Sequence, residues 1–324
     1  ALNALTHEMV LEMERVLRRW AEDPAVALVI VDGAGERAFC AGGDIQKLYE
    51  TGRAGDFAYG RRFWTDEYRL NALIAAYPKP YVAIMAGFVM GGGVGVSAHG
   101  SHRVVTETTQ VAMPECGIGL IPDVGGSHLL ARAEGHVGEY YGLTGARMSG
   151  MDAVLVNFAD LKVDGRDLPR LVARLAETGD AERIYDFGTD DVRSELAAIE
   201  DVVSAHFSAP TVPEIVAQLA MDPDPWAVAA KKAIGRNSPL SLATALVAIR
   251  AAREEPGVVP ALRREYRFVA RCMERGDFLE GIRAAVIDKD RTPAWPDTLE
   301  MLDPGRVAEM LAPLGPAELD LGGG

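Results

Sequence analysis

The sequence predicts an α/β fold with a parallel sheet in its first part and helices in its second. Short runs rich in β-branched residues alternate with helix-patterned stretches as far as about residue 155. This alternation is typical of a mostly parallel sheet covered by helices. Beyond that point the strand signals fade and helical patterns follow one another. The chain has 324 residues, of which 48% are hydrophobic, so it can bury a large core.

The first predicted element is an amphipathic helix near the start of the chain. Thr6 is placed to cap it, because its hydroxyl can accept a hydrogen bond from the first helical turn. Apolar residues then recur every three or four positions. These residues are Met9, Met13, Val16, Leu17 and Trp20.

Strands are predicted over residues 25–31, 81–86 and 103–106, where buried-strand patterns occur. Later in the chain, helices are predicted over residues 168–177, 192–207, 215–221, 226–234, 240–252 and 259–274. We therefore expect an α/β core over residues 1–155. A helical region over residues 156–324 is expected to complete the same domain.

Composition excludes several classes of partner. The formal net charge of −14 argues against nucleic acid or an anionic membrane as partner. Three cysteines in so long a chain favour a reducing compartment. No apolar run reaches the length of a transmembrane helix, and no signal or transit peptide is visible. These features predict a cytoplasmic protein, or one of the mitochondrial matrix if the source is eukaryotic.

Two glycine-rich turns are the most informative local feature. The apolar run over residues 80–90 ends in Gly91, Gly92 and Gly93, and a short helix of small residues is expected to follow. Upstream, Ala41, Gly42 and Gly43 form a second turn of small residues. Such turns let backbone amides approach a ligand closely. Oxyanion holes take one N–H group from each of two separate turns.

Two carboxylates follow the glycine turn at residues 91–93. Glu115 comes after Met-Pro, and Asp123 lies between Pro122 and Val-Gly-Gly. Amide donors with an acid or base beside them suit acyl transfer. The simpler alternatives are that Glu115 is a solvated loop residue and that Asp123 caps a helix over residues 125–131.

Other motifs are less informative about function. Two glycine patterns, at residues 33–38 and 93–98, match the dinucleotide fingerprint, but neither leaves room for the required crossover helix. His99 and His102 have the spacing of a metal pair without an evident third ligand, so no metal site is predicted. Cys40 and Cys116 have no histidine nearby in sequence, and we interpret them as packing residues.

The combination of FCAGGDI at residues 39–45 and MGGGVG at residues 90–95 resembles the crotonase (enoyl-CoA hydratase/isomerase) superfamily. The chain is most similar to the branch whose members hydrolyse 3-hydroxyisobutyryl-CoA. The similarity covers nearly the whole chain. The segments that carry it include DEYRLN at 66–71, AMPECGIGLIPDVGG at 112–126, LTGARMSGMDA at 143–153, NSPLSL at 237–242 and DFLEGIRAAVIDKDRTPAW at 277–295.

The resemblance implies a core built as a spiral of ββα units. It also implies that the natural N-terminus has been trimmed, because family members have a further strand before ALNAL. It assigns Glu115 and Asp123 as catalytic residues, and the amides of Ala41 and Gly92 as the oxyanion hole. Substrate-binding roles are implied for Glu67, Gly43, Asp44 and Gly91.

One departure from the family pattern bears on the chemistry. Hydratases of the superfamily use two glutamates, and the position of the first is occupied here by Gly95. The resemblance therefore favours hydrolysis of a short 3-hydroxyacyl-CoA thioester in valine breakdown. Glu115 serves either as nucleophile or as general base for water. The alternatives are an enoyl-CoA hydratase, a dienoyl-CoA isomerase or a non-catalytic acyl-CoA-binding protein. No cofactor is implied, since CoA is part of the substrate, and a homo-oligomer is compatible with the resemblance.

Overall fold

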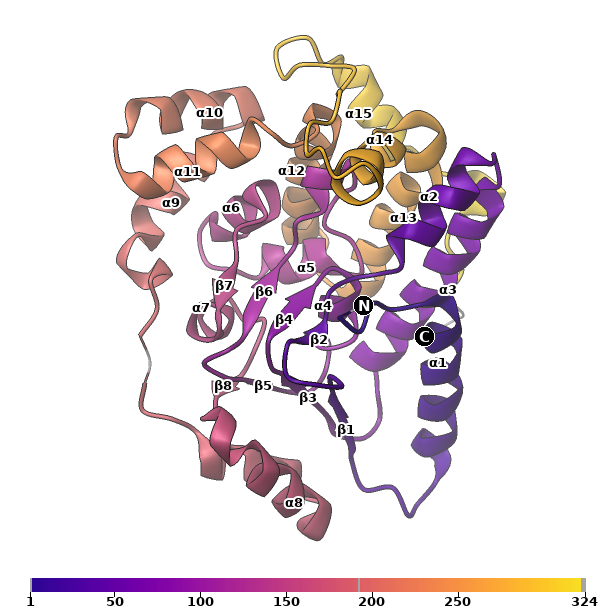
Figure 1. Cartoon of the computed structure of the whole chain (residues 1–324), viewed down its shortest axis with the longest axis vertical. Coiled ribbons are helices and arrows are strands. Elements are labelled where there is room, and N and C mark those ends of the chain that lie inside the picture. The colour runs from indigo at the N-terminus through magenta and orange to yellow at the C-terminus, as the bar shows by residue number, and fades with distance from the viewer. Residues whose placement is uncertain (1, 192, 322–324) are drawn as a thin grey trace. The chain divides into compact units, whose positions relative to one another are not determined.

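The computed structural model describes residues 2–191 and 193–321. Within them, short strands form two sheets, and most of the later chain is helical (Figure 1). The strands are β1 (Val29–Asp32), β2 (Ala38–Cys40), β3 (Tyr81–Met85), β4 (Phe88–Met90), β5 (His102–Val105), β6 (Gln110–Ala112), β7 (Met148–Ser149) and β8 (Leu161–Lys162).

The helices alternate with strands at first and then follow one another. They are α1 (His7–Glu22), α2 (Ile45–Arg53), α3 (Phe57–Ala75), α4 (Gly92–Gly95), α5 (Gly126–Ala131), α6 (Val137–Thr144), α7 (Gly150–Leu155), α8 (Leu168–Thr178), α9 (Glu200–Phe207), α10 (Val212–Met221), α11 (Pro225–Ile234), α12 (Pro239–Glu254), α13 (Val258–Arg275), α14 (Phe278–Ile282) and α15 (Pro304–Leu311). Shorter helical turns are η1 (Glu115–Ile118), η2 (Gly165–Asp167), η3 (Ala181–Phe187), η4 (Leu196–Ala198), η5 (Arg283–Ile287) and η6 (Gly315–Ala317).

Consecutive strands of the chain are shared between two sheets. One sheet has the order β1-β3-β5-β8 and the other the order β2-β4-β6-β7. Neighbouring strands are parallel, apart from the antiparallel pair β6 and β7. Because parallel neighbours need a crossover connection, each strand pair is followed by helical chain before the next pair begins. The predicted spiral of ββα units is thereby confirmed.

Several predicted elements are confirmed with shifted bounds. The strand predicted over residues 25–31 begins only at Val29, because Val26 N–H closes a turn on the carbonyl oxygen of Asp23 at 3.1 Å. The helix predicted over residues 192–207 is shorter, since α9 begins at Glu200. Upstream of α9, Ser194 and the N–H of Leu196 bond to the Asp152 carboxylate and hold that segment in a different conformation. Residue 192 itself lies outside the described residues.

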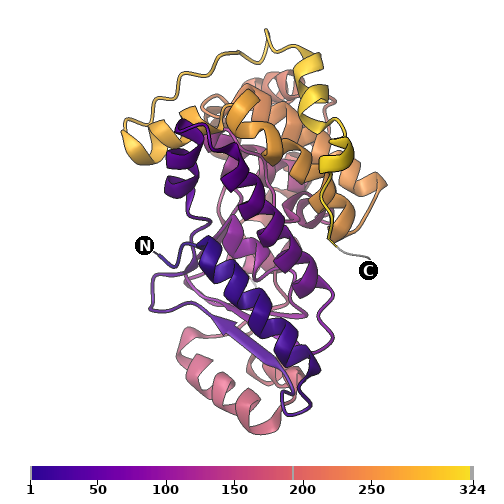
Figure 2. The same cartoon turned by 90° about the vertical axis from the view of Figure 1, so that its right-hand side faces the viewer.

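Helix α1 begins as the sequence predicts. The Thr6 hydroxyl accepts a hydrogen bond from Met9 N–H at 3.2 Å. The inner face consists of Val10, Glu14 and Leu17, whereas 40% of Met9 is exposed. Figure 2 shows α1 running beside β1, the edge strand of its sheet.

The contacts divide the described chain into two compact units, each made of separate stretches of sequence. The first unit takes residues 1–43, 69–112 and 147–199 and contains both sheets. The second unit takes residues 44–68, 113–146 and 200–324 and contains the helices from α9 to α15. The predicted division into a core over residues 1–155 and a helical region over residues 156–324 stays a prediction.

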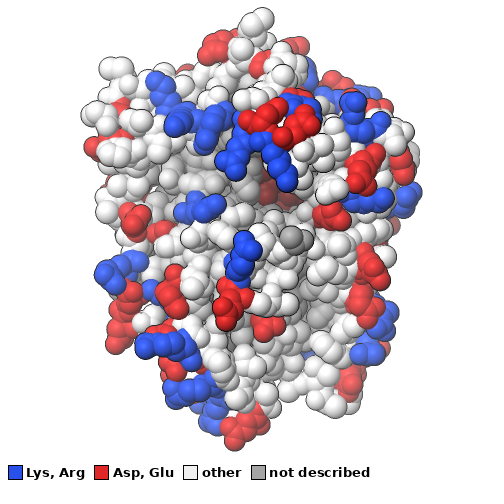
Figure 3. Space-filling view, in the orientation of Figure 1, with Lys and Arg blue, Asp and Glu red and all other residues white. Residues whose placement is uncertain are grey.

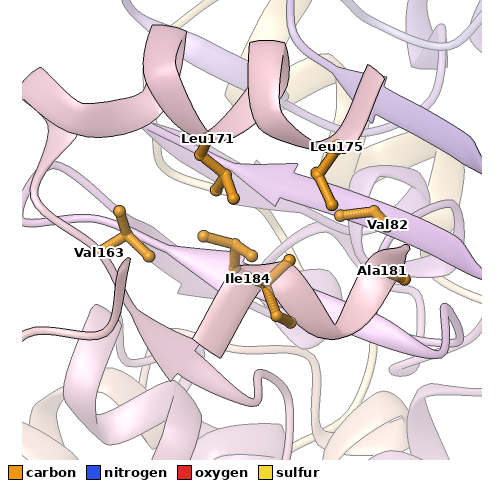
Figure 4. Close-up of a cluster of buried hydrophobic side chains, with 7 residues drawn as sticks. Val82, Val163, Leu171, Leu175, Ala181 and Ile184 are labelled. Carbon is orange, nitrogen blue, oxygen red and sulfur yellow. The ribbon is translucent and has the colours of Figure 1, made fainter. Parts of the chain in front are cut away.

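In the first unit, part of the core lies between a sheet and α8 (Figure 4). Val82 of β3 and Val104 of β5 are buried against Leu171 and Leu175 of α8. The cluster is completed by Val163 and by Ala181 and Ile184 of η3. Burial of these apolar surfaces favours folding and holds α8 against the sheet.

The second unit has a core rich in aromatic side chains. Trp64 of α3 packs on Phe278 of α14 with ring centroids 5.8 Å apart. Tyr68, on the next turn of α3, meets Tyr266 of α13 edge to face at 6.2 Å. Such aromatic contacts help to fix α3 against α13 within this unit.

Charged side chains of both signs lie on the surface. On the face shown in Figure 3, Lys and Arg side chains are interspersed with Asp and Glu. None of the helices in the described parts of the chain is long and apolar enough to cross a membrane.

Candidate active site

The glycine turn after β4 has a conformation that side chains would obstruct. Gly91 adopts φ 49° and ψ −117°, and α4 starts directly behind it. A Cβ atom on Gly93 would lie only 2.3 Å from the carbonyl oxygen of Cys40. The absence of a side chain therefore lets α4 pack directly on β2. Gly92 is the first residue of α4, so its N–H has no acceptor earlier in the helix.

The upstream turn lies next to the first glycine turn within the same unit. A Cβ atom on Gly42 would be 3.6 Å from the carbonyl oxygen of Met90. The N–H of Ala41 donates a hydrogen bond to the carbonyl oxygen of Leu2 at 3.1 Å. Gly43 pairs with Leu5 in an isolated parallel bridge. The two predicted turns are thus adjacent, and the N–H of Ala41 has a backbone partner in this structure.

Asp44 has a local structural task. It is the N-cap of α2, and its side chain accepts a hydrogen bond from Lys47 N–H at 3.4 Å. That bond satisfies one of the donors at the start of the helix. The substrate-binding role predicted for Asp44 stays a prediction.

Glu115 is a buried carboxyl group with an unsatisfied oxygen. It begins η1 directly after Pro114, and 5% of its surface is exposed. Its Oε2 atom is buried and has no hydrogen-bond partner among the described residues. Burial raises the pKa of Glu115 well above its usual value, and repulsion from Asp123 raises it further. A protonated Glu115 would be able to donate a hydrogen bond to a ligand.

Asp123 is held in a turn before α5. Its Oδ2 atom accepts a hydrogen bond from the Tyr68 hydroxyl at 2.8 Å. The residue that caps α5 is Gly125, so the simpler interpretation of Asp123 as the N-cap of that helix is wrong. Burial and then repulsion from Glu265 raise the pKa of Asp123 to about 7. A carboxyl group with this pKa can give up or take a proton near neutral pH.

Glu67 joins the same group of acids from α3. It is 2% exposed and directly precedes Tyr68 in the helix. Burial, followed by repulsion from Asp123, raises the pKa of Glu67 well above its usual value. Glu67, Glu115 and Asp123, all predicted from the sequence, are therefore close enough to influence one another's ionisation within the second unit.

Glu265 is a fourth buried carboxyl group, which the sequence analysis did not identify. It lies in α13 and is fully buried. A sequence signal was available, because Glu265 interrupts an apolar helical stripe of Ala261, Leu262, Phe268, Val269 and Cys272. A glutamate at a core-facing position needs hydrogen-bond partners.

Other nucleophiles and metal ligands contribute little to this group of acids. Burial raises the pKa of Cys116 and of Cys272 well above the usual thiol value, which keeps both thiols protonated. In the described part of the chain, His, Cys, Asp and Glu side chains do not gather in any group of three suited to a metal ion. What the arrangement offers chemically is proton transfer by carboxyl groups at adjacent sites.

The comparisons with known proteins agree on one family. The family model described as "Enoyl-CoA hydratase/isomerase" matches residues 1–311. The chain is 39% identical to the mitochondrial 3-hydroxyisobutyryl-CoA hydrolase of Gallus gallus over 336 aligned positions, which cover 99% of this chain and 86% of that protein.

Solved structures agree on the fold and differ in the activity named. A structure described as an enoyl-CoA hydratase from Rhodobacter sphaeroides 2.4.1 is 49% identical, with a TM-score of 0.93, and the match covers 99% of this chain and 94% of that one. One described as a carnitinyl-CoA dehydratase from Mycobacterium thermoresistibile is 42% identical, with a TM-score of 0.94, and the match covers 99% and 93%. The family match along the chain, the curated relative and these shared folds lead to one conclusion: the chain belongs to the enoyl-CoA hydratase/isomerase family.

Proposed function

We propose that this protein hydrolyses a short 3-hydroxyacyl-CoA thioester, with 3-hydroxyisobutyryl-CoA as the first candidate. Water adds its oxygen to the thioester carbonyl carbon, the carbon–sulfur bond breaks, and a proton reaches the sulfur. The products are the free hydroxy acid and CoA. No cofactor takes part in this scheme, because water is the only co-substrate.

The observation that carries the proposal is the set of carboxyl groups. Glu115 and Asp123 are both buried, and repulsion from Asp123 raises the pKa of Glu115, while Gly95 offers no carboxyl group where the hydratases of the superfamily carry a glutamate. The names of the curated relatives support the same reaction, since those from Gallus gallus and Rattus norvegicus are 3-hydroxyisobutyryl-CoA hydrolases.

In this proposal the backbone supplies the oxyanion hole. The N–H groups of Ala41 and Gly92 stabilise the negative oxygen of the tetrahedral intermediate, and Gly43, Asp44 and Gly91 help to bind the substrate. One such donor in a preorganised hole is worth about 3–4 kcal/mol of barrier. The N–H of Ala41 exchanges its bond to Leu2 for one to the substrate oxygen.

The carboxyl groups then divide the proton transfers. If two adjacent buried carboxyl groups both ionised, two negative charges would lie close together. One member of the pair therefore stays protonated while its partner ionises. Asp123 orients the water or assists proton transfer to the departing sulfur. Glu115 attacks the thioester or activates the water after it has lost its own proton. Glu67 accepts a hydrogen bond from the 3-hydroxyl group of the substrate.

The names of the relatives also suggest a pathway and a location for this protein. Release of 3-hydroxyisobutyrate from its CoA ester is a step of valine breakdown. We propose the cytoplasm as the location, or the mitochondrial matrix in a eukaryote, where the named vertebrate relatives are mitochondrial.

Hydration of an enoyl-CoA is the second candidate, because the structure from Rhodobacter sphaeroides that is 49% identical is described as an enoyl-CoA hydratase. With Gly95 in place of a carboxylate, Glu115 would have to hold the water and deliver the proton alone. A positioned acid or base contributes about 10²–10⁴-fold, so we expect hydration to be slower by that range than in an enzyme with two glutamates.

One pair of assays separates the two candidates. Free thiol is followed with a chromogenic disulfide for 3-hydroxyisobutyryl-CoA and, as a matched substrate without the hydroxyl group, isobutyryl-CoA. Loss of the ultraviolet absorbance of crotonyl-CoA is followed in parallel. We expect fast thiol release from the hydroxylated ester, slower release from isobutyryl-CoA and little change with crotonyl-CoA. Rapid loss of the enoyl absorbance without free thiol would establish the hydratase instead.

A further inference from the structure

Glu265 makes three hydrogen bonds to the turn that carries Asp123. One carboxylate oxygen accepts from Gly125 N–H at 2.7 Å. The other accepts from Ser127 N–H at 2.9 Å and from the Ser127 hydroxyl at 2.5 Å. All of these groups are buried and belong to the same compact unit. Glu265 therefore ties α13 to the start of α5 through charged hydrogen bonds, which are the stronger kind.

These bonds replace a cap that the sequence of α5 lacks. The N-cap residue is Gly125, which has no side chain to satisfy the N–H groups of the first turn. Glu265 reaches them from another helix, 140 residues further along the chain. Removal of its carboxylate would leave buried N–H groups without an acceptor.

The same turn contains a strained residue. Val124 has φ 55°, a left-handed conformation that a β-branched side chain rarely adopts, and it is 1% exposed. Gly126 N–H closes the turn on the carbonyl oxygen of Asp123 at 2.7 Å. A strained backbone persists only where its surroundings hold it, and such strain is common at active sites. Glu265 is one of the groups that hold it.

Glu265 also acts on Asp123 through its charge. Its repulsion is the second cause, after burial, of the raised pKa of Asp123, whereas the hydrogen bond from Tyr68 lowers that pKa. Cys272 of α13 also lies close enough for its pKa to be raised by Asp123. The titratable groups that face Asp123 are thus Glu67 and Tyr68 of α3, Glu115 of η1, and Glu265 and Cys272 of α13, with Arg264 acting on Glu265.

We propose that Glu265 is a positioning residue for the reaction: through its hydrogen bonds to Gly125 and Ser127 it holds the Asp123 carboxyl group in the place in which it serves the substrate. The role in turnover rests on the proposed hydrolysis. The anchoring of the turn does not, and it can be measured without substrate.

The test compares Glu265→Gln with Tyr68→Phe. Glutamine removes the negative charge and presents an NH₂ group to donors that need an acceptor, so kcat should fall by ~10²-fold, as a small displacement of a catalytic group predicts, with little change in KM. Loss of the charge should also move the high-pH limb of the rate profile to lower pH. Tyr68→Phe removes the hydrogen bond that lowers the pKa of Asp123, so this limb should move to higher pH.

A matched control is Glu139→Gln. Glu139 is another fully buried glutamate of the same unit, bonded to His136 at 2.9 Å and Arg253 at 2.7 Å. This change should leave the pH profile where it is. A milder variant, Ser127→Ala, removes only the hydroxyl donor to Glu265 and covers the case in which Glu265→Gln does not fold. Ser127→Ala should also lower kcat, by a smaller factor than Glu265→Gln.

Amide hydrogen exchange and the carbon-13 carboxyl signal of Asp123 give readouts without substrate. In Glu265→Gln, exchange at Gly125 and Ser127 should accelerate, and the Asp123 signal should titrate at lower pH than in the wild type. If both are unchanged, or if Glu265→Gln and Tyr68→Phe move the Asp123 titration in the same direction, the positioning role is wrong. If they change as expected while no acyl-CoA releases thiol from the wild type, the proposed hydrolysis fails and the anchoring stands.

Discussion

Replacing Asp123 by asparagine should stabilise the protein against unfolding above neutral pH while it impairs turnover. Asparagine has nearly the same shape, and its carbonyl oxygen can still accept the hydrogen bond from the Tyr68 hydroxyl. It cannot ionise, so the cost of a buried charge beside Glu265 disappears. Stability and activity should therefore change in opposite directions at this residue.

The magnitude follows from the pKa of Asp123, which rises from 3.8 to about 7 in the folded protein. Because the folded state binds its proton more tightly than the unfolded state, stability falls as pH rises between these two values. Each pKa unit corresponds to ~1.4 kcal/mol, so the full difference is on the order of 4 kcal/mol above about pH 7. The advantage of Asp123→Asn should grow by ~1.4 kcal/mol per pH unit between about pH 5 and pH 7 and then level off.

The assay is chemical denaturation of both proteins at several pH values from about pH 5 to pH 8. Asp164→Asn is a suitable control, because hydrogen bonding to Arg166 lowers the pKa of this half-buried carboxylate to about 2, so that Asp164 does not titrate in that range. The control should show no advantage that grows with pH. The reasoning is refuted if the difference between Asp123→Asn and the wild type is the same at every pH, or if the wild type becomes the more stable protein as pH rises.

Three further changes test the remaining parts of the site. Glu115→Gln should lower thiol release by at least ~10²-fold with CoA-ester affinity largely kept, because the shape stays and the base is lost; turnover near the wild-type rate would contradict this. Gly92→Pro removes an N–H donor and should reduce kcat in a protein that circular dichroism finds folded; an unchanged rate would make Gly92 a structural turn only. Gly93→Ala would place its Cβ 2.3 Å from the carbonyl oxygen of Cys40 and should lower the free energy of unfolding by ~1–3 kcal/mol, measured by denaturant titration, whereas unaltered stability would show that β2 and α4 can separate at no cost.

Local chemistry made several features predictable from the sequence. Thr6 was recognisable as a cap because its hydroxyl acts within a single helical turn. A short helix was expected at the run of three glycines, because glycines allow close backbone approach there, and α4 begins at the second of them, Gly92. Glu67, Glu115 and Asp123 came from the family resemblance, and the structure brings these three acids together in one unit.

The short strands of the second sheet were harder to predict. β2, β4 and β6 have three residues each, too few to establish an alternating pattern. They are strands because parallel neighbours pair with them, as Phe88 of β4 does with Gln110 of β6. Pairing across more than twenty residues is a tertiary property that no local pattern carries.

The sequence by itself determined which residue types are available: the glycines that allow close backbone approach, and the acids that can transfer a proton. Only the tertiary structure decided that Glu265, far along the chain, caps α5, and that Tyr68 rather than a helix terminus bonds to Asp123. It also decided the protonation of these acids, because desolvation and repulsion depend on what surrounds a carboxyl group in space. Composition lists the charges of a chain, but burial sets the free energy of ionising them.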